Sequence, residues 1–350
     1  MQYKLLGDKD SNNSLKVPLL CLGSMTWGSS QNTAAEGREQ ISMALANGLN
    51  FIDTAEMYPV NPISAETQGD SELTIGSWIK ENAQRDKLLI ATKIAGNGLD
   101  WIRNGSSITP DSIDEAVEGS LKRLHTDYID IYQLHWPNRG SFHFRQNWAY
   151  KAPKHSAEDA DEHFAAVSER LDQLVQSGKI RHWGLSNEST WGMAKWISHS
   201  TGKTKPISIQ NEYSPLCRTF DTDLGELCVN EDIGLLSFSP LACGLITGKY
   251  QNGAIPANSR RAIESTMHGR VNDKVWPAID AYLQLAQAHG LDPAQMALAW
   301  AMQRPFMGSV IFGSTTLEQL ETALGAQDMV LSEEVLDAMD EINRTHPMPY

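Results

Sequence analysis

The sequence predicts an α/β fold of the (β/α)8 TIM barrel type, with an N-terminal β-hairpin cap and long loops on the C-terminal face. Eight short apolar runs of strand length recur along the 350 residues, and helical patterns separate them. No Gly-rich G-x-G-x-x-G turn opens the first helix, as an open dinucleotide-binding sheet would require. Since we find no composition break, repeat or low-complexity tract, we expect one domain over residues 1–350.

The predicted elements follow in chain order. Residues 2–17 hold two short runs around an Asn-Asn turn, which predicts a hairpin that caps one end of the barrel. Stripes of apolar residues at helical spacing predict helices that include 111–125, 161–179 with its Ser-Gly stop, and 273–290, which ends at Gly290. The eight buried parallel strands are predicted at residues 18–23, 50–55, 87–93, 128–136, 179–187, 206–213, 234–240 and 308–314.

Charge and cysteine usage limit the possible partners and location. The formal net charge of -14 repels nucleic acid and anionic membranes, so we expect a small-molecule partner and neither of those. The amino terminus lacks the apolar region of a signal peptide, and no apolar run is long enough to span a membrane. The four cysteines have neither CxxC nor zinc-ligand spacing, so we expect buried reduced thiols in a cytoplasmic protein. The sequence leaves the oligomeric state open.

Four polar side chains follow three successive predicted strands. Asp53 ends the second strand and Tyr58 comes five residues later, Lys93 ends the third strand, and His135 ends the fourth. Each alone has a structural explanation, because a lysine at a strand end is usually solvated and a histidine beside Trp136 is more often a hydrogen-bonded structural group. Together they favour a site, since barrel chemistry gathers at the carboxyl ends of the strands.

These residue types suit protonation of a carbonyl oxygen. A tyrosine has an ordinary pKa of about 10, so a nearby cation such as Lys93 is needed to favour its charged form. Asp53 would compensate the charge of a lysine drawn into a pocket, and His135 would supply a second hydrogen bond to the reacting oxygen. We therefore expect Asp53, Tyr58, Lys93 and His135 to be the catalytic residues of this site.

The motifs DTAEMY at 53–58, ATK, QLHW and GLSN at 184–187 occur in an order that resembles the aldo-keto reductase family. The resemblance extends over essentially the whole chain, and the segments 58–72 and 290–300 are similar to the Tas-like bacterial subgroup. It implies a (β/α)8 barrel that uses NADPH to reduce an aldehyde or ketone to the alcohol. Tyr58 would then be the proton donor, and His135 would orient the substrate carbonyl.

The resemblance also implies where NADP(H) binds. The nicotinamide carboxamide would contact residues 186, 187 and 210, and Phe238 would stack where many relatives have tyrosine. The loop at 237–250 would cover the pyrophosphate, and residues 313–319 would hold the adenosine phosphate. Thr322-Ala323 replaces a frequent Glu-Asn pair, which implies fewer adenine contacts and a weaker preference for NADP over NAD. The expected cofactor residues are Gly23, Met25, Thr26, Asp53, Ser186, Asn187, Gln210, Phe238, Ser239, Leu241, Gly244, Lys249, Arg260, Gly313, Thr315 and Gln319.

The substrate is expected to contact Trp27, Tyr58, His135 and Trp136. A long insert at residues 138–156 follows His135, and its Phe142, Phe144, Trp148 and Tyr150 either wall the substrate pocket as a lid or pack the loop onto the barrel. Both interpretations are open at this stage. A basic lining from Arg139, Arg145 and Lys151 hints at an anionic substrate.

Two other functions would use part of the same set of residues. A metal-dependent hydrolase could use Asp53 and His135, but the strand ends offer neither an H-x-H pair nor a facing carboxylate cluster, so we expect no metal. The alternative within the same family is a nicotinamide-nucleotide-binding redox sensor or regulatory subunit with little turnover. The presence of all four catalytic residue types favours turnover of a carbonyl compound.

Overall fold

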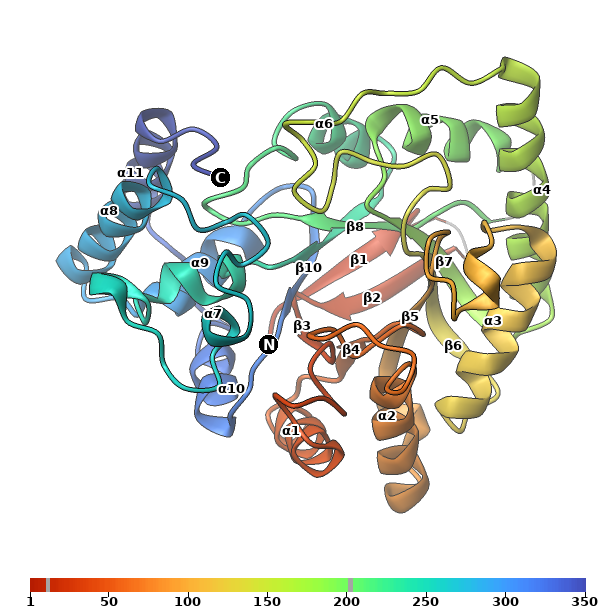
Figure 1. The fold of residues 1–350 in the computed structure, drawn as a ribbon, viewed down its shortest axis with the longest axis horizontal. Coiled ribbons are helices and arrows are strands. Elements are labelled where there is room, and N and C mark those ends of the chain that lie inside the picture. Colours follow the sequence, from red (N-terminus) through yellow and green to blue (C-terminus); the bar gives the residue numbers. More distant parts are fainter. Residues whose placement is uncertain (11–12, 201–203) are drawn as a thin grey trace.

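The computed structural model describes residues 1–10, 13–200 and 204–350, and its central feature is a closed barrel of eight parallel strands. Every predicted strand becomes a barrel strand, which confirms the predicted fold class. Figure 1 shows the helices arranged around these strands. In the order in which they pair around the barrel, the strands are β10 (Met307–Phe312), β3 (Leu20–Gly23), β4 (Phe51–Asp53), β5 (Leu89–Ile94), β6 (Ile129–Leu134), β7 (Ile180–Ser186), β8 (Ser208–Glu212) and β9 (Gly234–Phe238).

The predicted N-terminal hairpin is confirmed and closes one end of the barrel (Figure 1). Strands β1 (Tyr3–Gly7) and β2 (Ser14–Pro18) pair antiparallel, and residue 12 of the predicted turn lies outside the described residues. Leu6 is fully buried in the cluster formed by the side chains inside the barrel. A Cβ at Gly234 or Gly308, both at the N-terminal ends of their strands, would collide with the Leu6 side chain. The hairpin therefore fits into space that two glycines leave free.

The helices begin and end near the predicted bounds, with shifts that their caps explain. The helix predicted at 161–179 begins earlier because the Ser156 hydroxyl accepts a hydrogen bond from the Asp159 amide. The helix predicted at 111–125 begins at Pro110 behind a Thr109 capping box. The helices are α1 (Ala34–Ala46), α2 (Asp70–Asn82), α3 (Pro110–Arg123), α4 (Ala157–Gln176), α5 (Thr190–His199), α6 (Asp223–Asn230), α7 (Arg260–Ile263), α8 (Val275–Ala288), α9 (Pro293–Met302), α10 (Leu317–Leu324) and α11 (Glu333–Thr345).

The core has two parts that together leave one end of the barrel polar. The larger part lies between the strands and the helices, where the predicted stripe of α3, including Ile113 and Val117, is buried. The smaller part fills the barrel interior beside the hairpin. Towards the C-terminal ends of the strands the interior instead holds buried polar side chains, including Asp53, Lys93 and Gln210. This polarity marks the C-terminal end as the place to look for chemistry.

Long loops cover that C-terminal end. They include the insert at 138–156 between β6 and α4, and the segment at 239–274 between β9 and α8, which carries the 3-10 helices η3 (Ala242–Thr247) and η4 (Gln251–Gly253). Two further 3-10 helices, η1 (Arg85–Lys87) and η2 (Arg103–Gly105), lie elsewhere in the chain. Within the described ranges, no helix has the length and apolar character needed to cross a membrane.

Candidate active site

A buried ion pair forms the floor of the site. Lys93, which is fully buried in β5, places its ammonium 2.6 Å from Oδ2 of Asp53 and 2.7 Å from the carbonyl oxygen of Thr54. The other carboxylate oxygen of Asp53 accepts hydrogen bonds from the amides of Gln133 and Gln210, at 3.2 and 2.8 Å. Burial alone would lower the pKa of Lys93, but the Asp53 carboxylate and Tyr58 outweigh it and raise that pKa. The ammonium is therefore held in its charged form.

Tyr58 lies directly beside this ion pair. Its ring centroid is 4.8 Å from the Lys93 ammonium, and its side chain lines the main cavity. Burial raises the pKa of the Tyr58 phenol, while Lys93 opposes that rise. The sequence argument expected the cation to favour the charged form of the phenol. In the structure Lys93 does lower the pKa of the phenol, but burial raises that pKa by more, so Tyr58 keeps its proton.

His135 follows the last residue of β6 and faces the same cavity. Burial, together with the charge of Lys93, holds the pKa of His135 well below its ordinary value, so the imidazole is neutral. Its ring meets the ring of Tyr58 edge-on with centroids 5.8 Å apart, and it lies 4.9 Å from the ring of Trp136. A neutral imidazole has one N–H donor, which can bind an oxygen that also contacts the phenol.

These groups lie at a cavity of about 830 Å³ that opens among the C-terminal loops. Within the ion pair of the floor, Asp53 lines this cavity and Lys93 is buried behind it. Among the described residues, no group of three His, Cys, Asp or Glu could hold a metal ion. Most of the residues that the resemblance assigned to cofactor or substrate line this cavity. They are Gly23, Met25, Thr26, Asp53, Tyr58, His135, Trp136, Asn187, Gln210, Phe238, Ser239, Leu241, Gly244, Lys249, Arg260, Gly313, Thr315 and Gln319.

Besides Lys93, two expected site residues lie outside the wall of the main cavity. Trp27, in the loop after β3, is fully buried, and its indole N–H donates to Oε1 of Gln40 at 3.2 Å, so its side chain does not line the cavity. Ser186 turns its hydroxyl away, donating it to the carbonyl oxygen of Gln210 at 2.9 Å. Their positions in short motifs suggested contact with ligands, but alternate residues of a loop or strand end point in different directions. The Ser186 hydroxyl also accepts a hydrogen bond from the amide of Asn187, which lines the cavity.

The loop after β9 supplies unpaired positive charge. Lys249 and Arg260 line the cavity, and within the described part of the chain neither has a carboxylate within ion-pair distance. Burial, and then Arg260, lower the pKa of Lys249. At Gly244, which has φ 92°, a Cβ would lie 2.7 Å from Cε of Lys249, so glycine lets the lysine pass close to the backbone. Cys243 also lines the cavity and is only partly buried, unlike the other three cysteines, which are buried as expected.

The insert at 138–156 contributes both to the cavity and to its support. Phe144 and Arg145 line the cavity, whereas the indole of Trp148 is 73% exposed and does not. The Ser141 hydroxyl donates to the carbonyl oxygen of Asn187 at 2.8 Å, and the His143 ring contacts the next carbonyl oxygen at 3.2 Å. The insert is therefore tied to the segment that follows β7.

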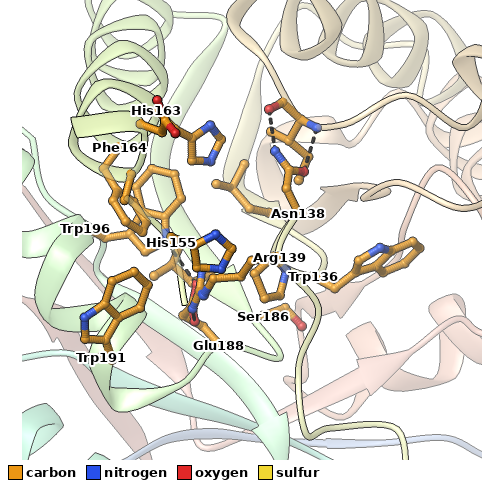
Figure 2. A pocket seen from close by; sticks show the side chains of 16 residues that line it. Trp136, Asn138, Arg139, His155, His163, Phe164, Ser186, Glu188, Trp191 and Trp196 are labelled. Atoms are coloured by element: carbon orange, nitrogen blue, oxygen red, sulfur yellow. Dashed lines mark hydrogen bonds and ion pairs between the residues drawn. The ribbon is translucent and has the colours of Figure 1, made fainter. Parts of the chain in front are cut away.

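A second, smaller cavity of about 200 Å³ lies between the insert, α4 and α5 (Figure 2). Figure 2 shows Arg139 in its wall, ion-paired with Glu188, and Trp191 facing the same space. The Arg139 guanidinium lies 5.0 Å from the Trp191 ring. Arg139 is therefore committed to this position and does not line the main cavity, although Trp136 borders both.

The model for the aldo/keto reductase family matches residues 19–344. The chain belongs to the aldo/keto reductase family. Protein tas of Escherichia coli is 39% identical over all of this chain and 99% of its own length. An aldo-keto reductase of Babesia bovis is 35% identical over 74% of this chain and 96% of its own. A probable voltage-gated potassium channel subunit beta of Arabidopsis thaliana is 29% identical over 99% of this chain and 98% of its own.

These similarities confirm the predicted family and support the Tas-like bacterial subgroup. For this aldo/keto reductase, membership of the family supports an oxidoreductase activity on carbonyl compounds.

Sequence reasoning missed several side chains that complete the site. Gln133 lies two residues before His135 in β6, and that spacing on one face of a strand was a usable signal. Glu212 lies two residues after Gln210 in β8 in the same way, and it pairs with Arg270. Arg270 had no local signal, because it follows an irregular segment whose path depends on tertiary contacts.

Proposed function

We propose that this aldo/keto reductase catalyses the NADPH-dependent reduction of an aldehyde or ketone to the alcohol, with Tyr58 as proton donor. The observation that carries the proposal is the meeting of a protonated phenol, a neutral imidazole and an ion-paired ammonium around one cavity. Tyr58 would donate its O–H to the carbonyl oxygen while His135 donates a second hydrogen bond. Lys93 would stabilise the phenolate left behind, and Asp53 keeps the lysine charged.

The residues around Asn187 fit a nicotinamide. Its amide nitrogen donates to the carbonyl oxygen of His135 and to the Ser186 hydroxyl, both at 3.0 Å. Its amide oxygen is buried without a partner in the described chain, although Asn187 lines the cavity. The N–H of a carboxamide would satisfy that oxygen, and Phe238 offers an aromatic surface in the same cavity. NADPH bound here would supply the hydride.

The phosphate groups of NADPH suit the loop after β9 and the start of α10. Lys249 and Arg260 line the cavity and have no acidic partner among the described residues, where Nε of Arg260 is also buried without an acceptor. Thr315 and Gln319 line the far part of the cavity, where the Gln319 side chain accepts a hydrogen bond from the Thr315 amide at 3.0 Å. We propose that this charge favours NADPH over NADH.

The function is tested by offering purified protein a panel of aldehydes and ketones with NADPH and following its oxidation by absorbance. We expect consumption of NADPH matched by formation of the alcohol, and weaker activity with NADH. A protein that binds NADPH but reduces none of the panel contradicts the proposal. Equal affinity for NADH and NADPH, measured by quenching of tryptophan fluorescence, would remove the cofactor preference alone.

A second candidate is a nucleotide-binding regulatory subunit with little turnover. It is favoured by the similarity to the protein named as a potassium channel subunit beta, which extends over nearly the whole chain. This candidate predicts that NADPH binds tightly and that single-turnover reduction is slow for every carbonyl in the panel. Fast multiple turnover of any member of the panel decides for the reductase.

A further inference from the structure

We propose that Arg145 selects carbonyl substrates that carry a carboxylate group, by binding that group at the outer part of the main cavity. The inference rests on the proposed carbonyl reduction and adds the class of substrate. The insert carries four Lys and Arg residues, and the structure places them differently. Arg139 is paired with Glu188 beside the smaller cavity, and Lys154, like Lys151, is exposed, so only Arg145 of the four lines the main cavity.

Arg145 has an acidic neighbour that is already occupied. Oε1 of the buried Glu212 accepts hydrogen bonds from Nε and Nη2 of Arg270, at 3.0 and 2.8 Å. The nearest guanidinium nitrogen of Arg145 is 3.6 Å from Oε2, which is too long for a hydrogen bond. The guanidinium also lies 4.4 Å from the Tyr350 ring centroid. Within the described part of the chain, Arg145 therefore has an ion pair and a stacking contact but no hydrogen bond.

The charges around Glu212 do not balance. Two guanidinium groups face one carboxylate, and the Arg145 side chain is only 12% exposed, so a net positive charge lies in a largely desolvated position. Such a position favours binding of an anion, and a guanidinium with free N–H groups binds a carboxylate with two parallel hydrogen bonds. The excess is notable in a chain whose formal net charge is -14.

The position of Arg145 relative to the catalytic groups suits the far end of a small substrate. Glu212 follows Gln210 by two residues on the same face of β8, which corresponds to about 7 Å along the strand. Gln210 itself contacts Asp53 on the catalytic floor. On the other side, the ring of Phe144 lies 6.1 Å from that of Trp136, next to His135. A carboxylate on Arg145 would thus lie one layer of side chains above a carbonyl on the floor.

The test compares two substrates that differ only in charge, 4-carboxybenzaldehyde and its methyl ester. With Arg145→Met we expect KM for the acid to rise by about 30-fold or more, while KM for the ester changes less than about 2-fold. Arg145→Lys should restore part of the preference, because the charge returns without the planar pair of donors. Lys151→Met is the matched control, and it should leave both substrates unchanged.

The outcomes separate this inference from its alternatives. An equal rise of KM for acid and ester, or a weaker NADPH affinity with an unchanged preference, would assign Arg145 to packing or to the cofactor and overturn the inference. If the wild type reduces neither the acid nor the ester nor any other carbonyl of the panel, the proposed reductase activity fails by itself. Binding of 4-(hydroxymethyl)benzoate to the protein with NADP+ then decides the role of Arg145. Calorimetry should show weaker binding in Arg145→Met, and unchanged binding would contradict us.

Discussion

The catalytic floor and the insert at 138–156 face the same cavity but are built in different ways. On the floor, Asp53 and Lys93 come from adjacent strands, are buried, and contact each other at 2.6 Å. The insert contains no helix or strand, and its aromatic side chains include Phe144, which is 49% exposed, and Trp148, at 73%. Strand register positions the first region, while a few side-chain bonds hold the second.

This difference suggests a division of roles. Groups fixed by strand register keep their geometry whatever the loops do, so the floor suits the steps that every substrate shares. An insert held by isolated hydrogen bonds can differ without disturbing the barrel, so it suits the choice of substrate. Changes on the floor should therefore affect all carbonyl compounds alike, and changes in the insert should affect some more than others.

The largest expected effect is at Tyr58. Tyr58→Phe removes the proposed proton donor and should lower carbonyl reduction by about 100-fold or more for every substrate, with little change in NADPH affinity. Tyr128→Phe is a matched control, because Tyr128 stacks between Arg85 and Arg181 away from the cavity. Reduction close to the wild-type rate in Tyr58→Phe would end the proposal.

Lys93→Met should also abolish most turnover, because the phenol loses the cation that stabilises its deprotonated form. It additionally leaves the buried Asp53 carboxylate without its counter-charge, which costs on the order of 3 kcal/mol of unfolding free energy. Denaturant unfolding and steady-state kinetics measure the two effects. Full activity with an unchanged pH profile would show that Lys93 does not assist Tyr58.

The wild-type pH profile sharpens the same comparison. The pKa of Tyr58 is raised and that of His135 is lowered well below its ordinary value, so neither changes its protonation between about pH 7 and pH 9. We expect kcat for carbonyl reduction to be level across this range in the wild type. A fall of kcat on the alkaline side centred below pH 9 would mean that the phenol ionises more easily than its burial implies.

The sequence predicted the floor better than the insert for a physical reason. Asp53, Lys93 and His135 stand at or beside strand ends, and the alternation of side chains along a strand makes their direction predictable. The boundaries were less accurate, since β4 ends at Asp53 although residues up to 55 look like strand. The contact of Arg270 with Glu212 joins an irregular segment to a distant strand, and no local pattern specifies it.

The insert illustrates what composition cannot decide. Its rings and cations suggested a lid or a packed loop, and both descriptions apply to different residues. Phe144 lines the main cavity, while Trp148 points into solvent and Arg139 lines the smaller one. Which side chain points inward depends on the backbone path, including the left-handed conformation of Phe144 and Arg145.

Phe144→Ala tests the insert directly. Removing the ring from the cavity wall should raise KM about 3-fold to 10-fold for substrates that fill this side, with kcat for small aldehydes nearly unchanged. Trp148→Ala is the matched control and should have no effect, because its indole is largely exposed. Equal effects of the two variants on every substrate would mean that the insert acts only as packing.

Replacing the whole insert by a short Gly-Ser turn is a broader version of this test. We expect a higher KM or a changed carbonyl preference in a protein that still folds. NADPH affinity should also fall slightly, because Ser141 and His143 contact the backbone carbonyl oxygens of Asn187 and Glu188, and Asn187 is proposed to bind the nicotinamide. Unchanged kinetic constants for every active carbonyl would remove the lid interpretation.

The smallest expected effect concerns His143. Burial lowers its pKa to about 4 in the docked insert, whereas an exposed histidine titrates near 6.5. Protonation therefore favours the undocked insert, and docking is weakened progressively as the pH falls from about 6.5 towards 4, by on the order of 1–2 kcal/mol at pH 5. Hydrogen exchange of amides in the insert, corrected for intrinsic rates, should report this loosening.

His143→Gln should remove that pH dependence. His182, in the barrel wall, has its pKa lowered to about 4 as well, but it should affect global unfolding without loosening the insert. Insert exchange that depends on pH equally in the wild type and in His143→Gln would assign the effect to another group.

The hairpin at the N-terminal end affects the order in which ligands can bind and leave. Because Leu6 fills the space left by Gly234 and Gly308, the N-terminal end of the barrel is closed. The main cavity opens at the C-terminal end. When two ligands lie one above the other in a cavity with one opening, the ligand that binds first must leave last. A nucleotide lying on the floor would thus be the first to enter and the last to depart, and product-inhibition patterns would show this sequence.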